Sequence, residues 1–154
     1  MVNYETKRCI VRPFELDDIE DVMVYRNNLE WMEFQGYKGK TKEEYAEGLL
    51  RLINLSEGCQ LAIFEKDLNK VIGDVYLIIN NQTLKFGYTI NPEYARRGYT
   101  FEVMDMIIEE MKEVITTFKA GVDKENIASV KLLEKLGLKY SHLEDKDLIY
   151  IMYN

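Results

Sequence analysis

A strand, a basic turn that contains a glycine, and a long amphipathic helix follow one another between Thr83 and Phe118. The turn reads Asn91-Pro92-Glu93-Tyr94-Ala95-Arg96-Arg97-Gly98-Tyr99-Thr100, and the helical stretch begins at Phe101. In such a turn, unpaired backbone N–H groups and the positive end of the helix dipole point to one place. Gly98 lets an anion approach without a Cβ in the way, and two arginines add positive charge. The segment is typical of a phosphate-binding turn, although an ordinary turn with exposed arginines has the same residues.

Hydrophobic periodicity divides the chain into short helices and strands. It predicts strands at 8–14, 60–65, 71–79, 83–90, 118–122, 138–142 and 148–153, and helices at 17–27, 41–55, 101–118 and 126–136. Thr41 and Glu44 have the spacing of a capping box at the start of the second helix, and Gly137 suits the end of the last one. We find no repeat or linker, and we therefore expect one mixed α/β domain over residues 1–154.

Composition argues against several classes of function. The net charge of −7 disfavours nucleic acid as a partner, because a phosphate backbone needs a surplus of lysine and arginine. No apolar run is long enough to span a membrane, and the N-terminus does not resemble a signal peptide. Cys9 and Cys59 lie outside any CxxC motif and, with one histidine, make no convincing metal site. We expect a cytoplasmic protein without a metal, whose acidic surface weakly favours partners such as amines.

Two motifs together resemble the GNAT superfamily of acetyl-CoA-dependent N-acetyltransferases. The first is Arg96-Arg97-Gly98-Tyr99-Thr100 at the strand-to-helix junction, and the second is Asn126-Ile127-Ala128-Ser129-Val130-Lys131-Leu132-Leu133-Glu134-Lys135-Leu136-Gly137-Leu138. Val11-Arg12-Pro13-Phe14 and Phe86-Gly87-Tyr88 resemble the branch typified by enzymes that acetylate ribosomal-protein N-termini. The resemblance implies a mixed, mostly antiparallel sheet of about seven strands, splayed between the fourth and fifth and flanked by about four helices.

The resemblance also implies which residues hold acetyl-CoA, the expected co-substrate. The family's pyrophosphate motif falls on Ala95, Arg96, Arg97, Gly98, Tyr99 and Thr100, of which Ala95 lacks the usual side-chain donor. The fourth strand, at Tyr88, Thr89 and Ile90, is expected to pair with the amides of the pantetheine arm. Asn126 and Ser129 match the family's asparagine and serine near that arm. Asn126 is equally a candidate helix N-cap, and Ser129 a local packing or capping residue.

The residues that would move protons are less clearly marked. Leu133 stands where many family members have an acidic tyrosine, although an apolar residue is common there in this branch, and Lys85 replaces a frequent carboxylate. Glu33 and Asp74 are candidate general bases, and Tyr140 is a candidate acid. Each has a plainer interpretation, as a solvated loop acid, a surface strand residue and a packing tyrosine.

The acceptor is expected to be a primary amine that attacks the thioester directly. Trp31, Phe34 and Tyr37 are candidates to wall its pocket, or else form a small core under a loop. Peptide N-termini, amino acids and small amines all remain possible acceptors. A catalytically degenerate acyl-CoA-binding regulatory module is the alternative function, and a structural domain without a coenzyme site is a third. A homodimer is also possible, since such domains often dimerise.

Overall fold

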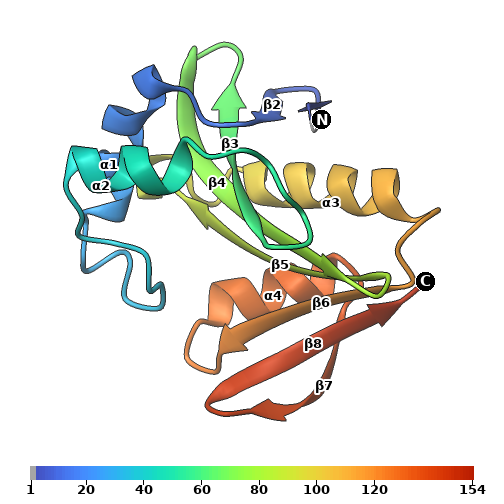
Figure 1. Ribbon diagram of the computed structural model, residues 1–154. Coiled ribbons are helices and arrows are strands. Elements are labelled where there is room, and N and C mark those ends of the chain that lie inside the picture. The colour runs from blue at the N-terminus through green and yellow to red at the C-terminus, as the bar shows by residue number, and fades with distance from the viewer. Residues whose placement is uncertain (1–2) are drawn as a thin grey trace.

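The computed structural model describes residues 3–154, which are organised around one eight-stranded sheet (Figure 1). The strand order is β1-β2-β3-β4-β5-β6-β8-β7, and neighbours are antiparallel except for the parallel pair β5 and β6. The strands are β1 (Tyr4–Glu5), β2 (Cys9–Arg12), β3 (Cys59–Glu65), β4 (Lys70–Asn80), β5 (Thr83–Ile90), β6 (Thr117–Asp123), β7 (Lys139–Glu144) and β8 (Asp147–Tyr153). The expected mixed, mostly antiparallel sheet is confirmed. It has one strand more than predicted, because two-residue β1 is too short to show alternation.

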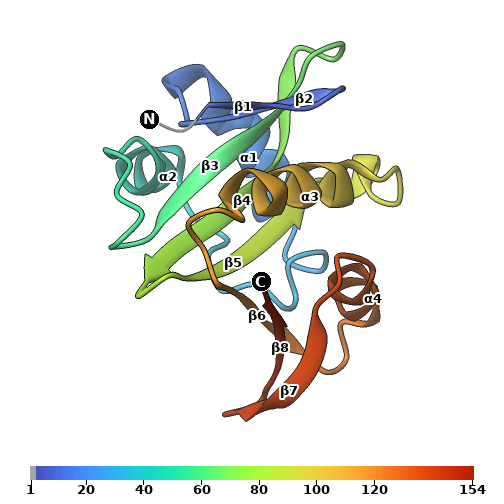
Figure 2. The same cartoon turned by 90° about the vertical axis from the view of Figure 1, so that its right-hand side faces the viewer.

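Four α-helices cover the two faces of the sheet (Figures 1 and 2). They are α1 (Ile19–Arg26), α2 (Lys42–Leu49), α3 (Tyr99–Met111) and α4 (Ile127–Lys135), and short 3₁₀ turns lie at η1 (Leu16–Asp18) and η2 (Pro92–Tyr94). Successive β3 side chains point to opposite faces. Ala62 packs in the core formed with α1 and α2, whereas Leu61 and Ile63 pack in the larger core formed with α3 and α4.

Two helices end earlier than their apolar pattern predicts. The second stops at Leu49 and not near residue 55, because the chain then runs beside β4, where the Ile79 N–H donates to the Leu55 carbonyl (2.8 Å). The third stops at Met111 and not at residue 118. β-Branched residues follow it, which favour extended backbone, and the N–H groups of Thr116 and Thr117 donate to the Gln82 carbonyl. Tertiary pairing thus overrides helical periodicity at both ends.

The predicted helix start at Thr41 is confirmed in detail. Thr41 Oγ1 accepts from the Glu44 N–H (3.1 Å), and the Glu44 carboxylate accepts from the Thr41 N–H (2.9 Å). β4 and β5 are joined by a two-residue turn at Asn81 and Gln82, both with positive φ (49° and 65°). Such a turn matches the twist of an antiparallel hairpin and fixes the register of the two strands.

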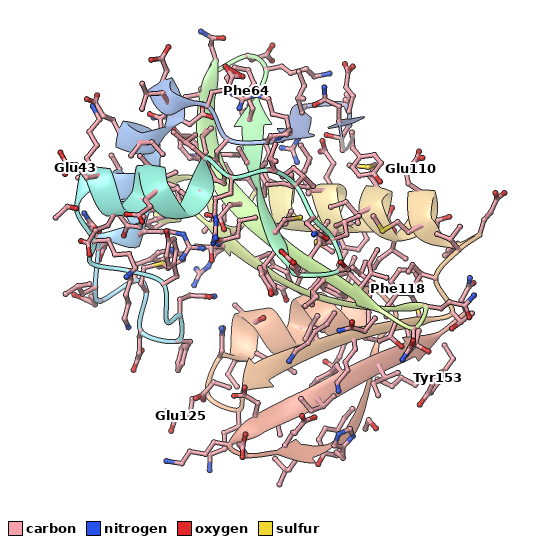
Figure 3. The ribbon with its side chains drawn as sticks, viewed as in Figure 1. Glu43, Phe64, Glu110, Phe118, Glu125 and Tyr153 are labelled. Atoms are coloured by element: carbon pink, nitrogen blue, oxygen red, sulfur yellow. The ribbon has the colours of Figure 1, made fainter. Side chains whose placement is uncertain are left out.

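The sheet opens between β5 and β6. Their pairing is confined to Thr83–Lys85 against Thr117–Lys119, after which the strands diverge (Figure 1). Phe118 is buried at this junction, while Glu43 and Glu110 lie on the outer sides of α2 and α3 (Figure 3). The predicted splay between strands 83–90 and 118–122 is therefore confirmed.

Within residues 3–154, no helix combines the length and apolar character needed to cross a membrane. The same part of the chain contains no group of three or more His, Cys, Asp or Glu side chains placed to hold a metal ion.

Candidate active site

The turn before α3 presents its backbone N–H groups to the outside. Gly98 directly precedes the helix in a left-handed conformation (φ 81°, ψ 6°), and Arg96 is also left-handed (φ 63°). Within residues 3–154, the N–H groups of residues 96–101 donate no hydrogen bond. A Cβ added to Gly98 would approach only the Arg8 guanidinium, at 3.5 Å. Free N–H groups, a helix N-terminus and an open glycine fit a pyrophosphate group.

Buried contacts fix both ends of this turn. The Asn91 N–H donates to the Ile72 carbonyl (2.7 Å), which anchors the end of β5. Tyr99 is buried beneath the Arg8 guanidinium, and its hydroxyl donates to Glu65 (2.6 Å). Tyr99 is one of the predicted coenzyme residues. It can contact the coenzyme only through its main chain, because its side chain is buried and bonded to Glu65.

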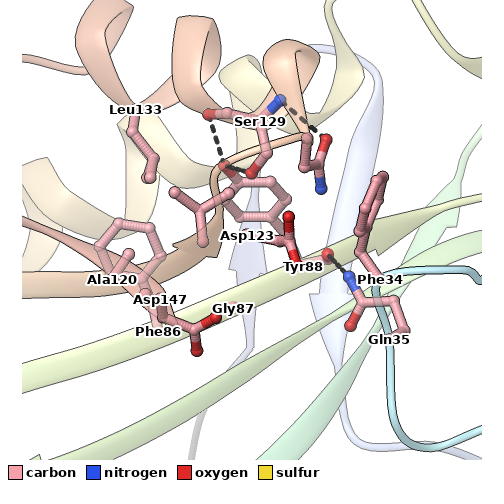
Figure 4. Close-up of a pocket in the computed structure, with 13 residues that line it drawn as sticks. Phe34, Gln35, Phe86, Gly87, Tyr88, Ala120, Asp123, Ser129, Leu133 and Asp147 are labelled. Carbon is pink, nitrogen blue, oxygen red and sulfur yellow. Dashed lines mark hydrogen bonds between the residues drawn. The ribbon is translucent and has the colours of Figure 1, made fainter. Parts of the chain in front are cut away.

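A cavity of about 160 Å³ occupies the opening between β5 and β6 (Figure 4). Its walls come from β5, β6, α4, the loop between α1 and α2 and, through Asp147, the start of β8. The Tyr88 hydroxyl lies within 2.8 Å of Ser129 Oγ. Burial raises the pKa of Tyr88 to about 12, so the phenol keeps its proton at neutral pH. Tyr88, Asn126 and Ser129, all predicted coenzyme residues, are thus brought together.

The start of α4 forms one side of this cavity. The Asn126 side chain accepts from the Ser129 N–H (3.3 Å), so the expected N-cap is present. One turn further, Leu133 also lines the cavity and is buried. The cavity therefore has an apolar side chain at the position of the family tyrosine, and its phenol comes from Tyr88 on β5.

A second cavity, of about 200 Å³, opens beside the first and extends along Tyr76 and Glu144. Phe86, Gly87, Gly121 and Asp147 line both cavities, which therefore meet where the sheet splays. A Cβ on Gly121 would lie 3.7 Å from Asp147 Oδ2, so this carboxylate reaches over a position without a side chain. The sequence analysis missed Asp147. It belongs to an acidic hairpin segment, and only the pairing of β6 with β8 brings it to the opening.

Asp74 and Thr89, predicted as base and coenzyme residue, lie on the other face of the sheet from Tyr88. Asp74 is buried and bonded to Arg26, and Thr89 Oγ1 accepts from the same guanidinium (3.3 Å). Neither residue lines the cavities. Asp74 therefore has the surroundings of a structural carboxylate.

The other predicted catalytic residues are scattered. Glu33 is exposed on the loop between α1 and α2, next to Phe34, which lines the first cavity. Tyr140 is on the edge strand β7, packed edge-on against Tyr150 and outside both cavities. Of the three predicted acceptor aromatics, Phe34 reaches the cavity and Trp31 contacts β5. Tyr37 packs against Tyr45 and α2.

Comparison with known proteins gives the same picture. The model of the acetyltransferase (GNAT) domain family matches residues 8–139. An uncharacterized N-acetyltransferase of Bacillus subtilis, YnaD, is 27% identical over 138 residues, which cover 87% of this chain and 81% of that protein.

Solved structures share the fold along nearly the whole chain. A GNAT-family acetyltransferase from Bacillus anthracis has a TM-score of 0.85 at 19% identity and covers 99% of this chain and 98% of its own. The ribosomal L7/L12 α-N-protein acetyltransferase RimL, solved with coenzyme A, has a TM-score of 0.82 at 13% identity with the same coverage. Together with the open turn at Gly98 and the splayed strands, the family match is decisive: the chain belongs to the GNAT family of acetyltransferases, enzymes that take their acetyl group from acetyl-CoA.

Proposed function

We propose that the chain transfers the acetyl group directly to a primary amine. The acceptor would be a peptide N-terminus, an amino acid or a small amine. The supporting observation is that Asp147 lines both cavities at the splay. One cavity is lined by Tyr88, Asn126 and Ser129, which are expected to border the pantetheine arm, and the other opens beside it for an acceptor. Asp147 would thus lie where the two substrates meet.

The coenzyme would be held by main-chain groups at its phosphates and by β5 along its pantetheine arm. The N–H groups of residues 96–101 would take the pyrophosphate, with Arg96 and Arg97 adding positive charge. Tyr88 and Ile90 would border the arm, and Asn126 and Ser129 would close its other side. When bound, acetyl-CoA supplies an acyl group activated as a thioester.

The second cavity suits a cationic acceptor that becomes neutral before it reacts. Glu144, Asp145 and Asp147 line it, offset by Lys85. Asp147 would accept a proton from the ammonium group, which frees the nitrogen lone pair to bond to the acyl carbon. Gly87 and Gly121 leave the passage between the cavities free of side chains. As the carbon–sulfur bond breaks, the Tyr88 hydroxyl would donate its proton to the departing sulfur, and the second proton lost by the nitrogen would return to the phenolate.

The alternative is an acyl-CoA-binding module without catalysis. Leu133 favours it, because this buried side chain offers no proton at the position of the family tyrosine. The two functions differ in a simple measurement. An enzyme releases coenzyme A thiol in an amine-dependent way, whereas a binding module binds acetyl-CoA and releases no more thiol than the background with any amine.

A panel of amines, assayed for thiol release from acetyl-CoA, is the test. The panel should contain short peptides with different N-termini, free amino acids and polyamines. With the best acceptor, Asp147→Asn is expected to lower kcat by about 10²-fold, the usual size of a general-base contribution. Coenzyme affinity, measured by calorimetry, should stay the same. Asp105→Asn, an exposed carboxylate on α3, is the matched control. An unchanged kcat in Asp147→Asn contradicts the role of Asp147.

A further inference from the structure

Two side chains of the loop between α1 and α2 are hydrogen-bonded to the backbone of β5. Trp31 Nε1 donates to the Ile90 carbonyl (2.7 Å), and Gln35 Nε2 donates to the Tyr88 carbonyl (3.4 Å). β4 pairs with β5 up to Ile90, but among the described residues no strand pairs with the opposite side of β5 beyond Lys85, so these carbonyls belong to an open sheet edge. The loop therefore supplies partners that a neighbouring strand would otherwise supply. Figure 4 shows Gln35 at the Tyr88 carbonyl.

These acceptors lie where the pantetheine arm would pass. Backbone groups of successive strand residues point alternately to the two edges. The Asn91 N–H points toward β4, where it donates to Ile72, and the carbonyls of Tyr88 and Ile90 point the other way, into the opening. An arm that runs from the turn at Gly98 into the first cavity must follow this edge. Its amide N–H groups need the acceptors that Trp31 and Gln35 now occupy.

The loop is firmly fixed at its base. The Asn27 side chain bonds both the N–H and the carbonyl of Lys40 (3.1 Å each), and the Gly39 N–H donates to the Arg26 carbonyl (3.2 Å). Met32 is buried and holds the middle of the loop against the protein. These contacts confine any rearrangement to the tip.

The side chains of Trp31, Phe34 and Gln35, at the tip of the loop, are only partly buried. Trp31 and Phe34 remain 41% and 38% exposed, which is high for such large apolar side chains, and Phe34 lines the first cavity. The hydrogen bonds of Trp31 and Gln35 therefore provide polar attachment of the tip to β5. A loop that is fixed at its base and at Met32, with two side chains that can leave the sheet edge, can act as a lid.

We propose that Trp31 and Gln35 are place-holders for the pantetheine amides. They occupy the β5 acceptors and release them when the arm binds, so these two side chains turn outward while Met32 stays buried, and they become the outer wall of the bound coenzyme. The inference rests on the coenzyme lying along β5 as proposed above. It adds a cost to coenzyme binding, because protein hydrogen bonds must break as coenzyme hydrogen bonds form.

Trp31 is the single tryptophan of the chain, and its fluorescence therefore reports directly on the tip. Coenzyme A should be titrated with emission spectra and calorimetry in parallel. The expected result is a red shift of the emission that saturates with the calorimetric isotherm, since the indole N–H exchanges a carbonyl for water. An absence of calorimetric binding contradicts the coenzyme site itself. Binding with an unchanged or blue-shifted emission overturns only the place-holder role.

Variants give an independent readout by calorimetry. Trp31→Phe keeps an aromatic ring but removes the N–H donor, and Gln35→Met removes the amide at similar length. Each is expected to bind coenzyme A about threefold to tenfold more tightly, the equivalent of one net hydrogen bond. Glu30→Gln, an exposed change in the same loop, is the control and should stay within about twofold. Unchanged or weaker binding in both donor variants overturns the proposal.

Discussion

Arg26 on α1 and Asp74 on β4 form a two-point ion pair in the interior, with Nη2–Oδ1 at 2.7 Å and Nε–Oδ2 at 3.0 Å. The residues are only 3% and 1% exposed, and the Tyr25 hydroxyl also donates to Asp74 (2.6 Å). Burial lowers the pKa of Arg26, but the carboxylate more than offsets this and holds it above the ordinary value. Since its oxygens already accept from these donors, Asp74 joins α1 to the sheet.

Asp74→Asn is therefore expected to act on stability. It leaves the Arg26 charge buried without its counter-ion, and it should lower the free energy of unfolding by about 3 to 5 kcal/mol, as measured by urea titration. The exposed Asp17→Asn is the control. In protein that remains folded, kcat should change little. A kcat loss of about 10²-fold with unchanged stability would instead support the predicted role of Asp74 as general base.

Gly98→Val tests the phosphate turn. A side chain at φ 81° is strained, and it would also lie between the coenzyme phosphates and the free N–H groups. We expect coenzyme binding to disappear from calorimetry while the fold persists with reduced stability. Gly137→Val places the same strain (φ 102°) after α4, away from the turn. If the two variants lose affinity equally, the loss comes from destabilisation and the turn assignment is wrong.

The conformation of residues that depend only on near neighbours in the chain was predictable from the sequence. Thr41 and Glu44 lie three positions apart, and their capping box depends on little else. Gly98 and Asn126 start helices within recognisable motifs, and their conformations follow from the chain around them. The splay was predicted only through family resemblance, since no local pattern specifies where two strands part.

Residues whose surroundings come from distant segments were not predictable. Asp147 is one acid among several in a hairpin segment, and it reaches the two cavities because β8 pairs with β6. Asp74 alternates with apolar neighbours along β4, which gives the pattern of a strand residue exposed to solvent. Its burial depends on Arg26, which lies far away in the sequence. In each case the missing information was a long-range partner.

Glu102 gives the protein a stability term that depends on pH. Burial raises the pKa of this carboxyl, but hydrogen bonds from Thr6 (2.6 Å) and from Arg8 (2.8 and 3.0 Å) outweigh it and hold the pKa below 4.5. A lowered folded-state pKa stabilises the fold above the unfolded value, and the contribution is lost as the pH falls through the folded value.

Glu102→Gln should therefore cost about 1 to 3 kcal/mol at pH 7, the range for hydrogen bonds to a charged group. The difference from the parent protein should shrink as the pH is lowered from 5 toward 3. Urea unfolding across this range is the measurement, and the exposed Glu110→Gln on the same helix is the control. A cost that stays constant down to pH 3 shows that the charge of Glu102 is not what stabilises the contact.

Tyr88→Phe separates proton donation from coenzyme binding. The variant keeps the ring in the first cavity but removes the hydroxyl that bonds Ser129. Because this phenol is protonated at neutral pH and lies beside the expected path of the thioester, its loss should lower kcat by about 10²-fold and leave coenzyme affinity within about twofold. Ser129→Ala removes the hydrogen-bond partner but keeps the phenol, and should reduce kcat less.

Steady-state kinetics with the best amine, alongside calorimetry, provides both kcat and the coenzyme affinity of each variant. Equal losses in the two variants indicate that the hydrogen bond between the residues matters and not the proton of Tyr88. An unchanged kcat in Tyr88→Phe means that water, and not this residue, protonates the leaving thiolate.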